Sequence, residues 1–466
     1  MTALIPTRSE SQSVEHGAWS QAISRAITAA EAAELELSRQ GGNNPTVQRK
    51  ASGSYYTPSD VAGHFWDLFF RHHKICNLTS LMTFIANHEL IEPSAGSGMF
   101  VFSFLRKAAS LGATPESLVA IRFHVIDINL SALRFFTEQM HQIEGEVGVQ
   151  FKSIGPSQNE FMAWSATTDV PNALFVGNPP FISNPRGHRW RNLYADFVEA
   201  MLNYRSVKGV SLILPLSVCF SRDYAELRAR MRSAGLGISA SSYDNIPDCL
   251  FKAGKPDSTN SNRANSQRCT ILNLGGPSPL IREASPLVCW SAEGRETMLS
   301  NLPLFRVFLD NDSSGQFPRP ASDLLVNYLS EGGQARPLRA FLSRIGRPAF
   351  AVGGVARNYI GLREVDEADP GAILVKVTSE NDRSVVLQAL SSRLFYDYWR
   401  TYGDGFHVTT DLVERFPVTD KLAQRFQQRQ DFAHGVWSNR RAYAKEKLNS
   451  GKIVRSYDLR AAFDEA

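Results

Sequence analysis

Seven short apolar runs, each followed by a segment long enough for a helix, constrain the fold of this chain more than any other feature. Short apolar runs of this kind are typical of buried strands. Strands that alternate with helices predict an α/β fold with a doubly wound, seven-stranded, Rossmann-like sheet. Open sheets of this class bind ligands beyond the carboxyl ends of their strands. The runs cover residues 89–92, 121–126, 148–152, 173–177, 209–214, 238–243 and 269–274.

Changes in composition divide the chain into four predicted regions. The first holds an Ala- and Glu-rich helix over 14–40, which we expect to pack on the next domain; the alternative is a helix that binds a partner. After residue 300 the pattern changes to short β-like runs, such as 373–377, and an aromatic-rich helix over 391–401. The predicted regions are a helical segment at 1–50, an α/β domain at 51–285, a mixed α/β domain at 300–430 and a basic helical tail at 431–466.

A glycine turn follows the first apolar run, in the sequence Glu92-Pro93-Ser94-Ala95-Gly96-Ser97-Gly98, and a predicted helix over 99–109 comes next. Gly96 and Gly98 tolerate a positive φ and let a ligand approach the backbone, and the helix N-terminus adds N–H donors. The second run is followed by Asp127, where nucleotide-binding α/β folds often hold a ribose diol. The order of these features predicts a cofactor that contains a nucleoside.

The fourth run ends in Asn178-Pro179-Pro180-Phe181. Two prolines fix two φ angles and remove two N–H donors, so carbonyl oxygens near the strand end can accept hydrogen bonds from another group. The Asn side chain adds an acceptor, and the Phe adds a flat apolar face. Acceptors beside an aromatic face suit a planar ring that carries an amino group. The alternative interpretation is a proline-rich turn with a buried Phe.

Together these motifs resemble those of the gamma-class, TaqI-like DNA adenine-N6 methyltransferases, which use S-adenosylmethionine. The resemblance covers about residues 50–280 and, more weakly, 380–420. It implies a catalytic domain at 51–285 and a target-recognition domain at 300–430 that binds double-stranded DNA. It also implies methyl transfer to the N6 amino group of a flipped-out adenine, with Asn-Pro-Pro-Phe as the catalytic motif, in a restriction-modification or phage-defence system.

The same resemblance implies a set of cofactor-binding residues and no metal. Glu160-Phe161 stands where the family has an Asp-Phe pair whose acid accepts from the cofactor adenine, and Asn159 is the alternative to Glu160. The implied residues are Tyr56, Thr57 and Pro58, then Glu92, Pro93, Ser94, Gly96 and Gly98, then Asp127 and Ile128, then Glu160 and Phe161, and finally Asn178.

Two further segments are predicted to face the substrate. A basic loop after the catalytic motif carries Arg186, Arg189 and Arg191 beside a tryptophan, which suits phosphate neutralisation and base stacking. The alternative is a solvated loop. Phe251 precedes a Ser/Asn-rich insertion at 252–268 and is the candidate for stacking on the flipped base; the alternative is a core residue.

Bulk properties agree with this interpretation without requiring it. The net charge of +4 allows a local basic surface. The five cysteines are scattered without a CxxC pair, which fits a reducing, cytoplasmic location and argues against a zinc site or disulfides. The sequence shows neither a run of membrane-spanning length nor a signal-peptide core. The sequence fits either a stand-alone methyltransferase or a subunit whose protein partners are restriction or other defence-system subunits.

Four alternatives remain open from the sequence. The first is a protein or RNA N-methyltransferase that shares the Asn-Pro-Pro-aromatic motif, although such enzymes generally lack a large C-terminal domain. The second is a catalytically silent DNA-binding subunit. A nicotinamide dehydrogenase would need a third glycine at GxGxxG spacing, which the turn at 96–98 lacks. Methylation of cytosine N4 is the fourth, and Asn rather than Ser before the prolines favours adenine by the resemblance.

Overall fold

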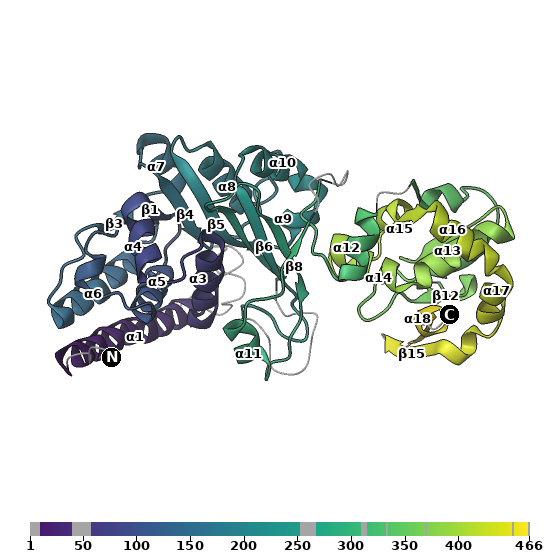
Figure 1. The fold of residues 1–466 in the computed structure, drawn as a ribbon, viewed down its shortest axis with the longest axis horizontal. Coiled ribbons are helices and arrows are strands. Elements are labelled where there is room, and N and C mark those ends of the chain that lie inside the picture. The colour runs from purple at the N-terminus through teal and green to yellow at the C-terminus, as the bar shows by residue number, and fades with distance from the viewer. Residues whose placement is uncertain are drawn as a thin grey trace, which may run out of the picture. The chain divides into compact units, whose positions relative to one another are not determined.

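The structure is a computed structural model that describes residues 10–39, 57–251, 267–308, 315–331, 334–368, 371–449 and 452–464. It divides into two compact units (Figure 1). The first unit comprises Met1–Glu283 and Val288–Phe317. The second comprises Ala284–Leu287 and Pro318–Ala466.

The large sheet of the chain is mostly parallel on one side and antiparallel on the other. Its strand order is β3-β2-β1-β4-β5-β7-β6-β8-β9. The five strands from β3 to β5 pair in parallel, whereas β7 runs antiparallel to both β5 and β6. The strands are β1 (Glu89–Glu92), β2 (Phe123–Asp127), β3 (Ile154–Gln158), β4 (Ala173–Gly177), β5 (Val207–Pro215), β6 (Gly237–Tyr243), β7 (Cys269–Gly275), β8 (Arg282–Val288) and β9 (Arg306–Val307).

The predicted sheet was correct in class and wrong in two details. The third strand is β3 and not 148–152, because Gly148 takes φ 69° and caps the preceding helix. As an edge strand β3 is partly exposed and contains a proline, so it lacks the apolar run that marks a buried strand. Among the described residues the sheet has nine strands and not seven. The two additional strands are hard to recognise in the sequence, because β8 mixes polar and apolar residues and β9 is only two residues long.

Helices cover both faces of this sheet (Figure 1). One group contains α3, α5 and α6, with α1 packed against α5 and α6; the other contains α7, α8 and α10. The helices are α1 (Glu10–Arg39), α3 (Ser59–His73), α4 (Leu78–Asn87), α5 (Met99–Ser110), α6 (Leu130–Val147), α7 (Phe161–Thr167), α8 (Leu193–Asn203), α9 (Ser217–Phe220), α10 (Ala225–Ser233) and α11 (Arg295–Ser300).

The N-terminal helix α1 packs on the first unit through one apolar stripe. The buried side chains recur at three- and four-residue spacing, the period of one helix face. They are Trp19, Ala22, Ile23, Ala26, Ile27 and Ala30. The Trp19 ring stacks on Phe151 with centroids 5.8 Å apart. The exposed Glu31 of α1 accepts a hydrogen bond from the Ser59 backbone N–H at 3.1 Å, and this bond links α1 to the start of α3.

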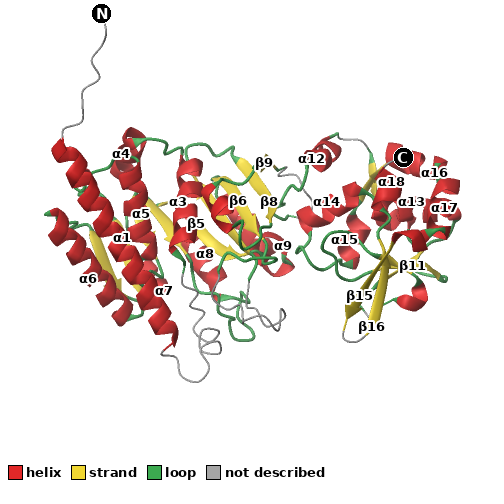
Figure 2. Ribbon diagram, turned by 90° about the horizontal axis from the view of Figure 1, so that it is seen from below, coloured by secondary structure: helices red, strands yellow, loops and turns green. Residues whose placement is uncertain are grey.

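The second unit combines helices with two small antiparallel sheets, β10-β14 and β13-β11-β12-β16-β15 (Figure 2). Its strands are β10 (Ala335–Pro337), β11 (Pro348–Val352), β12 (Leu362–Arg363), β13 (Ile373–Lys376), β14 (Pro417–Thr419), β15 (Ala444–Asn449) and β16 (Lys452–Tyr457). Its helices are α12 (Asp323–Ser330), α13 (Glu380–Ser391), α14 (Arg393–Tyr402), α15 (Thr410–Arg415), α16 (Asp420–Gln428), α17 (Gln430–Ser438) and α18 (Arg460–Asp464).

The predicted helical tail at 431–466 is wrong over its middle, where β15 and β16 form a hairpin. The Lys- and Glu-rich composition of β15 suits a helix, but pairing of β15 with β16 overrides that local preference. Glu446 lies opposite Arg455 across the hairpin, and the two form an ion pair at 2.8 Å. None of the helices in the described ranges is long and apolar enough to cross a membrane.

Candidate cofactor and catalytic site

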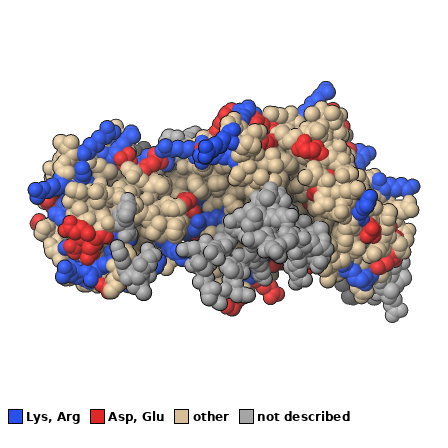
Figure 3. Space-filling model, turned by 180° about the vertical axis from the view of Figure 1, so that it is seen from behind, with Lys and Arg blue, Asp and Glu red and all other residues tan. Residues whose placement is uncertain are grey.

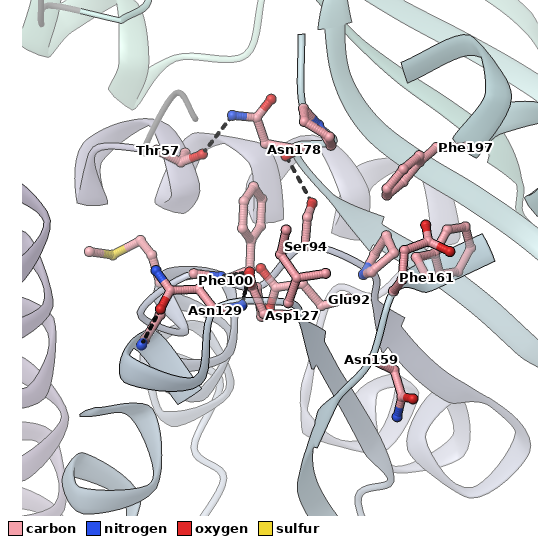
Figure 4. Close-up of a pocket in the computed structure, with 18 of the residues that line it drawn as sticks. Thr57, Glu92, Ser94, Phe100, Asp127, Asn129, Asn159, Phe161, Asn178 and Phe197 are labelled. Carbon is pink, nitrogen blue, oxygen red and sulfur yellow. Dashed lines mark hydrogen bonds between the residues drawn. The ribbon is translucent and has the colours of Figure 1, made fainter. Parts of the chain in front are cut away.

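A cavity of about 310 Å³ lies at the carboxyl ends of β1, β2 and β4 (Figure 4). Most of the residues that the sequence implicates line it: Thr57, Glu92, Pro93, Ser94, Gly96, Asp127, Ile128, Glu160, Phe161, Asn178 and Pro180. They come from segments as far apart as residues 57 and 180, and they meet because the carboxyl ends of neighbouring parallel strands share one edge of a sheet.

The glycine turn is held in place by Asp127. One carboxylate oxygen of Asp127 accepts from the Gly96 backbone N–H, and the other accepts from the Asn129 N–H, both at 2.8 Å. Gly96 has φ +54°, a conformation that L side chains rarely adopt. The Asp127 carboxylate therefore fixes the backbone at the ends of both β1 and β2, in addition to facing the cavity.

Glu92 is a buried carboxyl group without a partner. Its side chain is 1% exposed, and neither oxygen meets a hydrogen-bond donor among the described residues. Burial raises the pKa of Glu92 well above its usual range, and the nearby Asp127 and Glu34 carboxyls raise it further. An unpartnered polar group in the interior is costly, so its place in the wall of a cavity indicates a ligand that supplies the missing donor.

The predicted cofactor fits this arrangement of charge. S-adenosylmethionine carries an ammonium group and a sulfonium group, and four carboxyl groups line the cavity, those of Glu34, Glu92, Asp127 and Glu160. A cation that enters such a site removes the repulsion among the carboxyls and satisfies the buried oxygens. The acid-rich lining thus suits a cationic cofactor better than a phosphorylated one.

Asn178 is tied to two other parts of the site. Its Nδ2 donates to Thr57 Oγ1 at 3.3 Å, and its backbone carbonyl accepts from Ser94 Oγ at 3.1 Å. The residue before it, Gly177, has φ +134°, and a Cβ there would lie 3.4 Å from Glu92 Cγ. Strand β4 thus ends in close contact with the glycine turn, and Asn178 stands at one end of the cavity that Glu92 and Asp127 also line (Figure 4).

Three phenylalanine rings line the cavity, and two of them pack together. Phe100, Phe161 and Phe197 line it, and the rings of Phe161 and Phe197 lie 4.9 Å apart. Flat apolar faces of this kind suit a heterocyclic base. Figure 4 shows Phe161 and Phe197 on the side of the cavity opposite Asn129.

The residue that accepts a hydrogen bond from the adenine of the cofactor remains a prediction, and the candidates are Glu160 and Asn159. Glu160 caps α7, because its two oxygens accept from the Met162 and Ala163 backbone N–H groups at 3.0 and 2.9 Å. The Asn159 side chain donates to Ser157 Oγ at 2.6 Å and points away from Phe161 (Figure 4). Both residues line the cavity. The Glu160 carboxylate is already engaged in capping the N-terminus of α7.

Several implicated residues support the cavity without lining it. Pro58 precedes α3, and Gly98 precedes α5, where a Cβ would lie 2.2 Å from Phe136 Cδ2. Pro179 belongs to the catalytic motif but not to the lining. The Phe181 ring is 8% exposed and packs edge-on against Tyr194 with centroids 6.2 Å apart. Its stacking on a target base stays a prediction, and so does the role of Tyr56, which lies outside the described residues.

The basic loop is anchored to its own unit by ion pairs. Arg189 pairs with Glu199 of α8 at 2.6 Å, and Arg191 pairs with Asp223 at 3.1 Å. Trp190, which lies between the two arginines, is buried and donates to Glu199 at 2.7 Å. Arg186 is exposed. Phosphate contacts by these arginines stay a prediction, whereas the tryptophan has a structural role.

Phe251 is a buried residue, 6% exposed, and it does not line the cavity. Its contact with a flipped base stays a prediction. The insertion at 252–266 that follows it lies outside the described residues.

The structure adds lining residues that the sequence interpretation missed. They are Glu34, Met99, Phe100, Asn129, Ala132, Ile182, Leu193 and Phe197. One of them left a signal in the sequence. Glu34 follows Ala30 by four residues, so it continues the buried stripe of α1, where a charged residue is unusual.

The sequence matches no protein-family profile and no curated protein. Its structure is similar to restriction-modification enzymes in fold. The type IIL enzyme MmeI in complex with DNA is 12% identical, with a TM-score of 0.44, over 82% of this chain and 69% of that one. The DrdV–DNA complex is 13% identical, with a TM-score of 0.44, over 68% of this chain and 36% of that one. A nuclease-deletion mutant of the type ISP enzyme LlaGI with a DNA substrate mimic is 12% identical, with a TM-score of 0.42, over 65% of this chain and 29% of that one. This chain thus matches about a third of the length of DrdV and of LlaGI.

Proposed function

We propose that this chain is a site-specific DNA methyltransferase that transfers a methyl group from S-adenosylmethionine to the N6 amino group of a flipped-out adenine, within a restriction-modification or phage-defence system. One observation carries the proposal. Glu92 and Asn178 line the same cavity. The Glu92 carboxyl group meets no hydrogen-bond donor among the described residues and suits a positively charged group. Asn178, in the Asn-Pro-Pro-Phe motif, offers acceptors for an amino group.

The residues of the glycine turn and its neighbours would hold the cofactor. The carboxyl groups of Glu92 and Asp127 suit its ammonium group and its ribose hydroxyls, and Phe161 and Phe197 suit its adenine ring. When bound, S-adenosylmethionine supplies a methyl group activated by its sulfonium.

Asn178 and Pro179 would prepare the nucleophile. The lone pair of an adenine amino nitrogen is delocalised into the ring, so the amino group must be held with that lone pair turned toward the methyl group. Asn178 Oδ1 and the Pro179 carbonyl can each accept one amino hydrogen. The hydrogen bond from Asn178 Nδ2 to Thr57 orients the amide with Oδ1 turned away from Thr57 (Figure 4). Positioning of this kind supplies much of the rate of a displacement reaction.

The target adenine must leave the base stack of the duplex to reach this site, at a cost of a few kcal/mol in free energy. Phosphate contacts from lysine and arginine can offset that cost. On the face that Figure 3 shows, Lys and Arg side chains are interspersed with Asp and Glu side chains. We expect phosphate contacts at particular arginines, such as the exposed Arg186.

The test is to express the chain in a host that lacks adenine methylation and to measure N6-methyladenine in its DNA. We expect site-specific N6-methyladenine with the natural chain. Asn178→Ala should reduce methyl transfer by about 100-fold or more, because the amino group is no longer positioned, while cofactor binding persists. Asn203→Ala makes the same change at an exposed site at the end of α8 and should methylate normally.

Two results would contradict the proposal. Undiminished methylation by Asn178→Ala would show that Asn178 does not position the adenine amino group. Methylated glutamine or RNA in place of methylated DNA would favour the protein or RNA methyltransferase.

A further inference from the structure

The N-terminal helix α1 reaches the cavity through one residue that the catalytic proposal does not use. Glu34 is 7% exposed and lines the cavity together with Glu92 and Asp127. The Ser97 hydroxyl of the glycine turn donates a hydrogen bond to its carboxyl group. Glu34 therefore contacts the turn from outside the sheet, on a helix that precedes every other element of the site.

We propose that Glu34 of the N-terminal helix is a cofactor-binding residue that gives up a proton when its carboxylate pairs with the positive charge of S-adenosylmethionine. This inference rests on the proposed function, because it takes the cofactor to be cationic. Its consequence is that α1 is part of the cofactor site and not only a packing element.

A second, independent feature of the cavity points to a cationic ligand at this place. Glu92 is 1% exposed, lines the same cavity, and meets no hydrogen-bond donor among the described residues. Two buried carboxyl groups that face one cavity repel each other when both are ionised. A cation between them removes that repulsion, so the pair suits a positively charged ligand and disfavours an anionic one.

The titration of Glu34 follows from its surroundings. The pKa of Glu34 is raised to about 8. Burial raises it most, the hydrogen bond from Ser97 lowers it, and the charge of Glu31 on the same helix raises it. Glu92 of β1 lines the same cavity, and its pKa is raised by burial and then by the charges of Asp127 and Glu34. At neutral pH, Glu34 thus holds a proton before the cofactor binds, and a bound cation favours its loss.

Proton linkage gives the sign of the effect. If binding releases a proton, the affinity for the cofactor rises with pH, by up to about tenfold per pH unit for one proton, until the pH passes the pKa of the free protein. The affinity should therefore increase between pH 6 and pH 8 and level off above that range.

The experiment is titration calorimetry of the full chain with S-adenosylmethionine at pH 6, 7 and 8, in buffers of different ionisation enthalpy so that released protons are counted. We expect the natural protein to release protons. Glu34→Gln keeps the size of the side chain and an acceptor for Ser97, but it has no proton to lose. This variant should release fewer protons on binding. The difference between its affinity for S-adenosylmethionine and that of the natural protein should grow as the pH rises, with the variant binding more weakly. Glu34→Asp, which restores the charge, should recover part of the pH dependence.

Glu138→Gln is the matched control, since it makes the same change at an exposed site of α6, outside the cavity, and Glu138 is not among the residues that shift the pKa of Glu34. It should retain proton release and affinity. Thermal melting of each variant separates folding from binding.

Equal proton release and equal pH dependence in Glu34→Gln and the natural protein would overturn the inference. So would an affinity loss that is the same at every pH, because that is the signature of a structural role. If the natural protein binds no S-adenosylmethionine at any pH, the proposed function itself fails, and the inference fails with it.

Discussion

At the scale of single residues, one side chain often does two things at this site. Asp127 faces the cavity, and it also binds the backbone N–H groups of Gly96 and Asn129 at 2.8 Å. Asn178 combines a side chain held by Thr57 with a backbone carbonyl held by Ser94. A substitution at either position therefore changes both a ligand contact and the shape of a loop.

Asp127→Ala should weaken cofactor binding by roughly 10- to 100-fold, since hydrogen bonds to a charged group contribute about 1.5–3 kcal/mol. It should also lower the melting temperature, because two backbone N–H groups lose their acceptor. Titration calorimetry and thermal unfolding measure the two effects. Asp127→Asn, which keeps a side-chain acceptor for one N–H group, should unfold at a temperature nearer the natural one. An unchanged dissociation constant in Asp127→Ala would show that the acid is only a cap for the turn.

At the scale of elements, the site depends on how closely the glycine turn meets the helices around it. Gly98 ends the turn at φ +87°, and a Cβ on it would lie 2.2 Å from Phe136 Cδ2 of α6. Real Cβ atoms do not approach so closely, so any side chain there must displace either the ring or the start of α5. The spacing of α5 and α6 thus decides where the turn lies.

Gly98→Ala should destabilise the fold by about 1–3 kcal/mol and weaken cofactor binding, because both backbone strain and overpacking act on the turn. Gly112→Ala is the control for strain alone, since Gly112 has φ +91° but a Cβ on it would meet nothing within 4 Å. Chemical denaturation of the two variants compares them. An equal loss of stability in both would mean that Phe136 yields without cost.

At the scale of the whole molecule, the cofactor cavity lies within the first unit, whereas the second unit has a hydrophobic core of its own. In the second unit, the segments at 355–357 and 406–407 lie side by side. The Ala356 N–H donates to the Phe406 carbonyl at 2.8 Å, and Val355 forms a bridge with His407. The exposed Arg357 lies over the Phe406 ring at 5.7 Å. Side-chain donors on such a surface can read base edges in the major groove.

Removal of residues 318–466 should leave S-adenosylmethionine binding largely intact and abolish site-specific methylation, since the cavity residues all precede this segment. The deletion begins at residue 318 because the main segment of the second unit begins there. Solubility and thermal unfolding of the truncated chain are measured first, followed by calorimetry and methylation assays. Methylation of the same DNA site by the truncated chain would show that target recognition lies in the first unit.

The sequence alone determined the class of the fold and the position of most of the cavity. Runs 89–92 and 173–177 are the observed β1 and β4, and the residues that follow them line one cavity. This works because the location of a parallel strand's carboxyl end is a local property, and neighbouring ends must meet at one edge of the sheet. The sequence likewise singled out Asp127 and Asn178 by their place after a strand.

Tertiary structure decided what depends on contacts between distant segments. The edge strand β3 and the hairpin of β15 and β16 have little apolar periodicity, and pairing with other strands determines their conformation. Glu34 reaches the cavity only because α1 packs along α5 and α6. The sequence shows that an acid falls at the spacing of the apolar stripe of α1. Which groups its carboxyl meets depends on helix packing, and no local sequence pattern encodes that packing.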